Sequence, residues 1–584
     1  MAQVKVTIDG ITLEVPKEYT VLEAAQKANI DIPTLCYLNL HETSMKSNKA
    51  SCRVCVVEVE GRRNLAPACV TPITEGMVIK TNTMRVLKAR KKIVELLLSD
   101  HPKDCLVCTK AGDCELQNLV EKFGIRNSSE INKGEQSTYP IDQSYSLIRD
   151  MDKCVMCRRC ETMCNQVQSV GALAGVERGF KAIVGTAFNK PIMETVCTHC
   201  GQCVAVCPTG ALTERENIDE VVKAIANPHK KVIVQVAPAV RVALGEDFDY
   251  PAGSIVTGKM VAALKQIGFD YVFDTDFAAD VTIMEEGAEL VSRIEKVLKR
   301  ETDVKLPILT SCCPAWVNFY ETQFTDLLDL PSTARSPQQI FGAIAKSYFS
   351  EKMNIPKEDM VVVSVMPCLA KKYEVERPEF NHDVDISIST RELARLIKQM
   401  NINFESLKEA EFDRPLGESS GAGIIFGTTG GVIEAAVRTA YEKITGESLE
   451  KIDFYELRGF EGVRTATVKA GDLEINIGIA HGLKNARMIM DEIRAGNPRN
   501  LHAIEVMACP GGCIGGAGQP YHHGDGEILQ KRRQALYKDD VANEIRKSHE
   551  NSEVIALYDT YLKTPISEKA HALLHTYYKA QERI

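Results

Sequence analysis

The sequence predicts a multidomain α/β protein in which cysteine-rich modules precede a larger domain built on parallel sheets. A chain of 584 residues, 44% of them hydrophobic and 26% charged, can bury several cores. Fifteen of the 20 cysteines lie before residue 210, in short and closely spaced groups. Beyond them, apolar strand-like runs at 231–240, 271–276, 361–368 and 502–509 alternate with long helical segments. That alternation is typical of α/β layers with parallel sheets.

Composition excludes several classes of function. No uninterrupted apolar run reaches the roughly 18 residues of a membrane helix, and residues 1–15 alternate like a strand instead of forming a signal peptide's apolar block. We therefore expect a soluble, unexported, cytoplasmic protein with no membrane contact. The net charge of -9 and the lack of a basic patch argue against nucleic acid as a partner. In such a chain, clustered cysteines indicate zinc or iron-sulfur centres more than disulfides.

Residues 1–80 predict a hairpin at 4–15, a helix at 21–29 and a four-cysteine site. The segment resembles a plant-type 2Fe-2S ferredoxin domain of the β-grasp fold, although the gap between the first two cysteines is longer than in that pattern. A four-cysteine zinc site is the alternative. The expected ligands of one 2Fe-2S cluster are Cys36, Cys52, Cys55 and Cys69.

Residues 81–135 combine a predicted helix at 84–100 with the segment HPKDCLVCTKAGDC. One imidazole and three thiolates complete a four-ligand site, and spacing alone does not separate zinc from a cluster. In context the segment resembles the 4Fe-4S site of iron hydrogenases and of the large iron-sulfur subunit of respiratory complex I. That resemblance implies the ligands His101, Cys105, Cys108 and Cys114.

Residues 136–218 carry the spacing C-x2-C-x2-C-x3-C twice, which is a specific signal for a bacterial-type ferredoxin with two 4Fe-4S clusters. In that pattern the fourth cysteine of each run ligates the other cluster. One cluster is then assigned Cys154, Cys157, Cys160 and Cys207, and the other Cys164, Cys197, Cys200 and Cys203.

The five remaining cysteines occur in TSCCPAW, MPCLAKKYE and ACPGGCIGG, three motifs that closely resemble those of the iron-only hydrogenases. Buried cysteines packed as small hydrophobes are the alternative. The resemblance, to single-chain clostridial-type members with four accessory clusters, implies an H-cluster catalytic domain at 219–528 and a helical small-subunit-like tail at 529–584. It implies a 4Fe-4S cubane held by Cys313, Cys368, Cys509 and Cys513. Cys513 would also bridge to a two-iron unit that carries carbon monoxide, cyanide and a dithiolate amine.

The resemblance also implies a proton path and a ligand pocket. The path begins at the free thiol of Cys312 and continues through Glu286, Ser332, Glu289 and Arg293. A helix would align the three members from MEEGAELVSR on one face, although an ordinary solvated acidic helix has the same spacing. Lys371 is expected to donate a hydrogen bond to cyanide. The other pocket positions are Ala237, Pro238, Gln338, Met366 and Met507, which read alone would be core residues.

The implied reaction is reversible: two protons and two reduced ferredoxins give H2 and two oxidised ferredoxins. No nucleotide motif is evident, so we expect electrons from ferredoxin or a similar carrier, and a two-iron unit supplied by maturation proteins. The alternatives are an H2 sensor and an electron-transfer or cluster-assembly relative without the two-iron unit. Leu309, Pro331 and Ala517 motivate a further hypothesis, in which the Cys312 loop is loose enough for its thiolate to cap the distal iron against O2.

Overall fold

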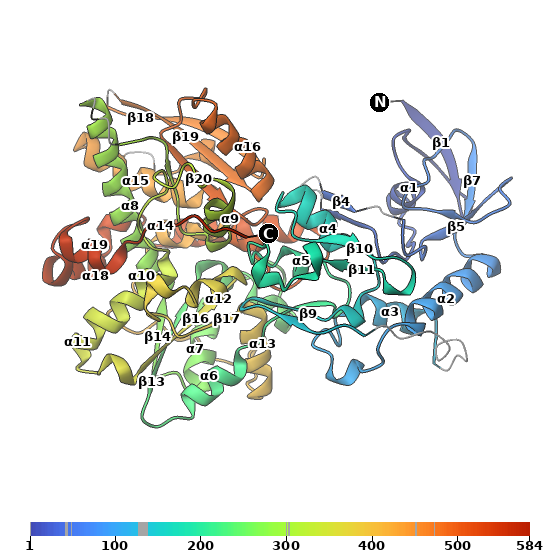
Figure 1. Ribbon diagram of the computed structural model, residues 1–584, viewed down its shortest axis with the longest axis horizontal. Helices are drawn as coiled ribbons and strands as arrows, with labels where there is room; N and C mark the ends of the chain where they lie inside the picture. Colours follow the sequence, from blue (N-terminus) through green and yellow to red (C-terminus); the bar gives the residue numbers. More distant parts are fainter. Residues whose placement is uncertain are drawn as a thin grey trace.

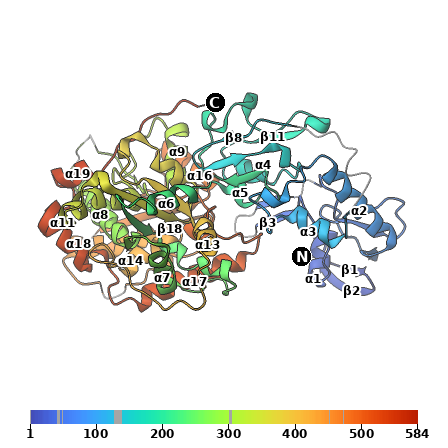
Figure 2. The same ribbon diagram turned by 90° about the horizontal axis from the view of Figure 1, so that it is seen from below.

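The computed structural model describes residues 2–40, 45–47, 50–126, 138–299, 301, 304–449, 452–471 and 473–583. The cysteine-rich modules lie at one end of the long axis and the larger α/β part at the other, and the C-terminus returns to the junction between them (Figures 1 and 2). Among the described residues, no helix combines the length and apolar character needed to span a membrane. The predicted boundary at residue 135 lies outside the described residues, and the other domain boundaries stay predictions.

The first module is a small mixed sheet. The predicted hairpin is confirmed, and Asp9 and Gly10 form its turn with positive φ, as the right-handed twist of a two-residue hairpin requires. The helix α1 (Val21–Lys27) follows, with Thr20 and Glu23 forming a capping box. The sheet order is β2 (Ile11–Pro16), β1 (Gln3–Ile8), β7 (Met77–Lys80), β5 (Val56–Val59) and β6 (Ala66–Pro67).

Short elements carry the next two modules. The predicted helix at 84–100 is confirmed as α2 (Met84–Ser99), and α3 (Glu115–Lys122) follows the third cysteine of its group. The two-cluster module holds only short helices and strands because its cysteine loops set the backbone path. These are α4 (Arg159–Thr162), α5 (Gln202–Ala205), β8 (Asp142–Gln143), β9 (Leu147–Arg149), β10 (Ala174–Val176), β11 (Ile183–Gly185) and β12 (Leu212–Glu214). The hairpin of β3 (Leu38–Leu40) and β4 (Met45–Ser47) packs against this module.

The larger part contains two sheets, and the four apolar runs supply three of their central strands and one edge strand. The first sheet is entirely parallel, in the order β14 (Tyr271–Asp274), β13 (Lys231–Val236), β16 (Met360–Met366) and β17 (Ile386–Ser389). The second has the order β15 (Ile308–Leu309), β20 (Ala503–Met507), β19 (Leu473–His481) and β18 (Val463–Ala470), with only β18 antiparallel. The predicted α/β class is confirmed.

Helices cover both sheets and leave the carboxyl ends of the strands for the site (Figure 1). Those before the tail are α6 (Ile218–Ile225), α7 (Thr257–Ile267), α8 (Thr275–Leu298), α9 (Pro314–Gln323), α10 (Pro337–Ile344), α11 (Ser350–Met353), α12 (Ala370–Val375), α13 (Thr390–Gln399), α14 (Gly421–Ile424), α15 (Gly431–Thr445) and α16 (Leu483–Arg494).

The tail is helical only in part. It forms α17 (Gly526–Ala542), α18 (Ser552–Leu557) and α19 (Glu568–Leu574), and residues 576–583 then run extended, contrary to the expectation of a helix to the end. The physical reason lies in the partners of that segment. Its backbone N–H groups at Thr576, Lys579 and Gln581 donate to Thr333 and Glu321 instead of to the preceding turn.

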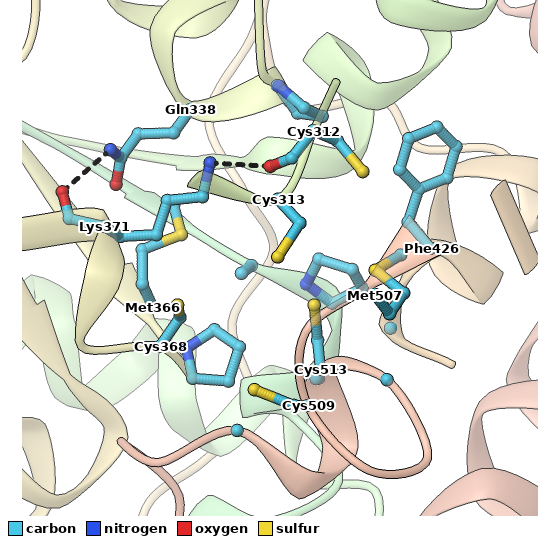
Figure 3. Close-up of a pocket in the computed structure, with 18 of the residues that line it drawn as sticks. Cys312, Cys313, Gln338, Met366, Cys368, Lys371, Phe426, Met507, Cys509 and Cys513 are labelled. Atoms are coloured by element: carbon cyan, nitrogen blue, oxygen red, sulfur yellow. Dashed lines mark hydrogen bonds between the residues drawn. The ribbon is translucent and has the colours of Figure 1, made fainter. Parts of the chain in front are cut away.

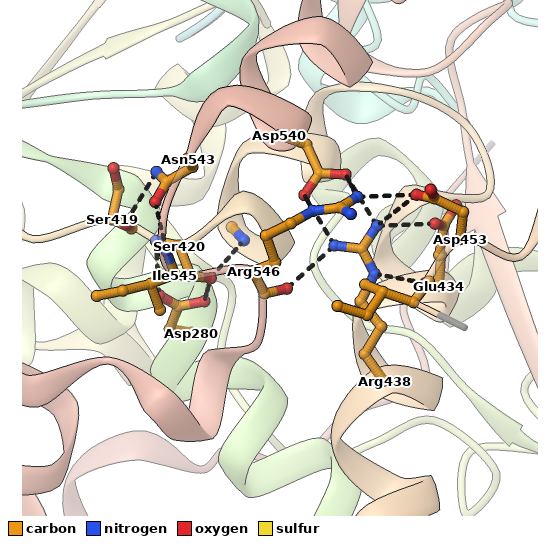
Figure 4. A network of polar contacts seen from close by, with 12 residues as sticks. Asp280, Ser419, Ser420, Glu434, Arg438, Asp453, Asp540, Asn543, Ile545 and Arg546 are labelled. Carbon is orange, nitrogen blue, oxygen red and sulfur yellow. Dashed lines mark hydrogen bonds and ion pairs between the residues drawn. The ribbon is translucent and has the colours of Figure 1, made fainter. Parts of the chain in front are cut away.

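Buried ion pairs tie the tail to the larger part. The fully buried Arg438 of α15 pairs with Glu434 and, through both terminal nitrogens at 2.9 Å, with Asp540 of α17 (Figure 4). Arg546 reaches the same Asp540 carboxylate at 2.7 Å and Asp453 at 2.8 Å. Removing one partner of such a network leaves an uncompensated buried charge, at a cost of about 3–5 kcal/mol.

Candidate active site

Five cysteines converge on one cavity between the two sheets. Its empty volume is about 710 Å³, and its lining comes from segments that directly follow β13, β15, β16 and β20. Ligands of open α/β sheets bind outside these carboxyl ends. The sulfurs of Cys313, Cys368, Cys509 and Cys513 face a common space, while that of Cys312 stands apart on the side of Phe426 (Figure 3).

Burial dominates the ionisation of the thiols in this cavity. Burial, and then the repulsion of neighbouring sulfurs, raise the pKa of Cys368, Cys509 and Cys513. A cluster of iron cations would offset both effects, so the donor set fits an iron-sulfur centre. Gly512 has a φ of +93°, and a Cβ there would lie 2.6 Å from Thr429 N, so the loop before Cys513 follows a path closed to other residues.

Lys371 supplies a buried positive charge beside the cysteines. Burial opposes that charge, but Glu374 outweighs it and the pKa of Lys371 is raised. Its Nζ donates to Cys312 O at 3.1 Å and to Glu374 Oε2 at 2.9 Å. Gln338 donates to the same Glu374 oxygen at 2.8 Å and accepts from Ser364 at 2.7 Å. Glu374, three residues after Lys371 on α12, was not among the predicted residues, although the i, i+3 spacing to a charged neighbour was visible.

The remaining predicted pocket residues all line the same cavity. Ala237 and Pro238 follow β13, Met366 ends β16 and Met507 ends β20. Phe426, which sequence reasoning missed, adds an aromatic wall. These apolar walls exclude water from around the cysteines, which strengthens every charge interaction inside.

A row of polar groups leads from Cys312 toward the surface along α8. Ser311 donates to Glu286 Oε1 from its N–H at 3.4 Å and its hydroxyl at 3.2 Å. The Ser332 hydroxyl donates to Glu289 Oε2 at 2.9 Å, and Arg293 pairs with Glu289 Oε1 at 2.5 Å. Burial, and then the charge of Glu289, raise the pKa of Glu286 to about 7. The expected helical alignment of these α8 residues is therefore present.

The tail touches this row, a contact with no signal in the local sequence. Tyr578 donates from its Oη to Ser332 O at 2.7 Å, and its phenol also contacts the Ser311 side chain. Burial, and then the charges of Glu286 and Glu289, raise the pKa of Tyr578. Residues almost 250 positions apart thus share one polar row.

The accessory cysteines also gather in the predicted groups. Cys55 Sγ lies 3.4 Å from Cys69 Sγ, and Cys36 hydrogen bonds to both Cys52 and Cys69. In the second group Cys105 is exposed, and the buried Nδ1 of His101 has no hydrogen-bond partner among the described residues, so it is available as a metal ligand. A Cβ on Gly210 would lie 2.7 Å from Cys108 Sγ, so this group packs tightly on the two-cluster module.

The two-cluster module brings cysteines together across its repeats. A cavity with an empty volume of about 360 Å³ is lined by Cys154, Cys157 and Cys160 of the first run and by Cys207 of the second. Cys164, the fourth cysteine of the first run, instead lies close enough to the second run for its charge to raise the pKa of Cys197, Cys200 and Cys203. This is the crossed arrangement that the spacing predicts.

Hydrophobic clusters join the cysteine groups in series. One cluster contains Cys36, Cys52 and Cys157 and packs against Cys114, so three groups share it. Another cluster packs against Cys200, Cys313 and Cys368, which links the inner accessory group to the main cavity.

The three residues behind the O2 hypothesis do not form one group. Leu309 pairs with Pro331 through a β-bridge directly before the Cys312 loop. Ala517 instead packs against Leu369 and the two-cluster module, and a Cβ on Gly201 would lie 2.9 Å from it. The hypothesis stays a prediction.

Known families match along almost the whole chain. "Iron only hydrogenase large subunit, C-terminal domain" matches residues 230–517 and "Iron hydrogenase small subunit" residues 526–581. The 2Fe-2S iron-sulfur cluster binding domain matches 1–84, the NADH-ubiquinone oxidoreductase-G iron-sulfur binding region 90–129, and a 4Fe-4S binding domain 190–213.

Named relatives agree with these matches. The chain is 63% identical to "NADP-reducing hydrogenase subunit HndD" of Solidesulfovibrio fructosivorans, with both chains fully covered. It is 39% identical to "Iron hydrogenase 1" of Clostridium pasteurianum, covering 98% of this chain and 99% of the relative. A solved structure of apo [FeFe]-hydrogenase HydA1 from Chlamydomonas reinhardtii matches with a TM-score of 0.56 and 40% identity, over 62% of this chain and 98% of that one.

Proposed function

Since the chain belongs to the iron-only hydrogenase family and is a hydrogenase oxidoreductase, we propose that it reduces protons to H2 reversibly, with ferredoxin as electron carrier. One observation carries the proposal: four cysteines face a common space in a buried cavity that also holds Lys371 and the separate thiol of Cys312. An electron-transfer ferredoxin needs the four ligands but neither of the other two groups.

Four cysteines would hold the catalytic centre. When bound, a 4Fe-4S cubane joined to a two-iron unit with carbon monoxide, cyanide and a bridging dithiolate amine supplies the metal at which electrons and protons combine. Its ligands would be Cys313, Cys368, Cys509 and the bridging Cys513. Lys371 uses two of its three N–H donors on Cys312 O and Glu374, which leaves one for an anionic ligand such as cyanide.

The chain's own residues move the protons. Cys312 exchanges a proton with the site, and its thiol stays neutral between transfers because burial, and then the charge of Glu286, raise its pKa. Glu286, with a pKa of about 7, is suited to accept and return protons near neutral pH. Ser332, Glu289 and Arg293 continue the path toward solvent.

Electrons would travel through one 2Fe-2S and three accessory 4Fe-4S clusters, on the ligand sets that the spacing predicts. The hydrophobic clusters that join neighbouring cysteine groups support a relay in which electrons pass from the accessory groups to the main cavity. The name of the Solidesulfovibrio relative favours a second candidate carrier, NADP reached through another subunit. We further propose a cytoplasmic location, because reduced thiols suit that compartment, and a two-iron unit supplied by maturation proteins.

Infrared spectroscopy of the anaerobically matured holoenzyme tests the proposal. We expect bands in the carbon monoxide and cyanide stretching region that shift when H2 is added, together with H2 production from reduced ferredoxin. Bands without rapid turnover would favour the H2 sensor, and a full iron content without bands would favour the assembly or electron-transfer relative. Turnover with NADPH and a partner subunit but not with ferredoxin would show that NADP is the carrier.

The O2 hypothesis has its own test. If Cys312 caps the distal iron, air-exposed wild-type enzyme recovers its infrared bands on reduction and Cys312→Ala does not. Equal recovery by the two proteins, or none by the wild type, would remove the hypothesis while leaving the hydrogenase proposal intact.

A further inference from the structure

A second chain of hydrogen bonds reaches the proton path from the tail. Glu285, next to Glu286 on α8, is fully buried and faces the tail. Its Oε1 accepts from Tyr558 Oη at 2.5 Å, and its Oε2 accepts from Ile566 N at 2.7 Å. The same Oε2 lies 3.0 Å from His575 Nε2. None of these groups belongs to the path proposed above.

The other ring nitrogen of His575 continues the chain. His575 Nδ1 lies 2.8 Å from Thr333 Oγ1, and that hydroxyl lies 3.4 Å from Glu289 Oε2. The side chain of His575 is 1% exposed, and both of its nitrogens are engaged. An uninterrupted series of donors and acceptors therefore joins Glu285 to Glu289, which is already a member of the proposed path.

Backbone pairing holds these groups in register. Arg335 N donates to Leu574 O at 2.8 Å, Thr576 N donates to Thr333 O at 2.7 Å, and Ala334 forms an antiparallel bridge with His575. This pairing and the Glu285 contact anchor the tail beside α8. The hydroxyl of Thr333 is the atom that connects His575 to Glu289.

A second, exposed histidine lies against His575. The exposed His571 of α19 stacks on it, with ring centroids 4.8 Å apart and planes inclined by 6°. The charged groups that face His575 and its partner are Glu285, the Arg335 guanidinium at His575 O, and Lys443 of α15, whose charge acts on Glu285.

We propose that Glu285, His575 and Thr333 form a second proton branch that joins the path at Glu289. In one transfer, the N–H bond at His575 Nδ1 breaks as its proton forms a bond to Thr333 Oγ1. The original hydroxyl proton of Thr333 passes to Glu289 Oε2, and a proton carried by Glu285 Oε2 forms a bond to His575 Nε2, 3.0 Å away. Protons alone move, with no change in electrons. This inference rests on the proposed hydrogenase function.

Thr333→Val tests the branch, with Thr333→Ser as the matched control. Valine removes the hydroxyl but keeps the shape of the side chain and the backbone N–H that donates to Glu289 at 3.0 Å. Serine keeps the hydroxyl and this N–H. In the matured holoenzyme with reduced methyl viologen, we expect Thr333→Val to lower kcat several-fold. That is less than the roughly 100-fold minimum for losing a positioned acid, because the Arg293 branch still operates. The KM for viologen and the infrared bands should stay unchanged, and Thr333→Ser should match the wild type.

The double variant separates a proton branch from a structural role. If two branches supply Glu289 in parallel, Thr333→Val combined with Arg293→Met loses more activity than the product of the two single losses. His575→Gln, which retains an amide donor toward Glu285 but cannot relay a proton between two ring nitrogens, should behave like Thr333→Val. Should Thr333→Val equal Thr333→Ser, or the losses simply multiply, the branch does not exist. H2 production by the wild-type enzyme tests the hydrogenase proposal separately and does not depend on either result.

Discussion

The accessory modules and the catalytic cavity assemble their cysteines in opposite ways. In the two-cluster module, each run places four thiols within eleven residues, and short loops carry them. In the cavity, Cys313, Cys368 and Cys509 come from segments about 50 and 140 residues apart, brought together by two packed sheets. Among the accessory cysteines Cys105 is exposed, whereas every cavity cysteine is buried or partly buried. Electrons can thus enter near the surface, while protons need a path of their own.

The largest expected effect lies at the buried end of this comparison. Cys312→Ala removes the proposed proton carrier without removing a cluster ligand, so H2 production should fall about 10²–10⁴-fold, the scale of general acid-base catalysis. The infrared bands and the iron content should remain. Activity close to that of the wild type would show that protons reach the cavity without this thiol.

Glu286→Gln comes next, and its effect depends on pH. Because burial and Glu289 raise its pKa to about 7, Glu286 holds its proton below that pH and loses it above. Proton-limited H2 production should therefore fall as pH rises through about 7. The variant should be about 100-fold less active and should not show this fall with pH.

Folding stability gives an independent reading of the same group. The folded pKa exceeds the ordinary value of 4.5, so the folded state binds more protons between pH 4.5 and about 7, and stability falls as pH rises through that window. Thermal unfolding of Glu286→Gln should show a weaker decline than the wild type. An unchanged slope would mean that Glu286 ionises normally.

Cys105→Ser probes the exposed end of the comparison and should have a smaller effect. Losing one of four predicted ligands at the exposed group should disrupt that cluster and lower the rate with reduced ferredoxin several-fold. The catalytic infrared bands should be unchanged, because no cavity residue moves. A loss of those bands would show that the two regions do not assemble independently.

The smallest expected effect joins the two regions. Arg583, near the C-terminus, donates to Tyr373 Oη at 2.8 Å and lies 3.5 Å from Cys197 O, beside the inner accessory group. Its charge favours the reduced cluster, so Arg583→Gln should lower that potential by tens of millivolts, the effect of one charge roughly 10 Å away at an effective dielectric near 20. Redox titration by electron paramagnetic resonance measures the shift, and Arg583→Lys should restore most of it.

Several elements could be predicted because their signals are local. The hairpin at 4–15, the helix at 84–100 and the central strands β13, β16 and β20 follow from alternation and periodicity over a few residues. The crossed pairing of the two cysteine runs follows from spacing alone. The extended end of the tail did not follow, since its hydrogen-bond partners lie some 240–260 residues earlier.

The sequence by itself therefore determined the α/β class, the cysteine groups and the family, because short spacings and motifs specify them. Only the tertiary structure decided which distant side chains meet: Glu374 with Gln338, Tyr578 with Ser332, and His575 with Glu285 and Thr333. These contacts depend on how two sheets and a tail pack, and packing follows from buried surface summed over the whole molecule. No window of the sequence contains that sum.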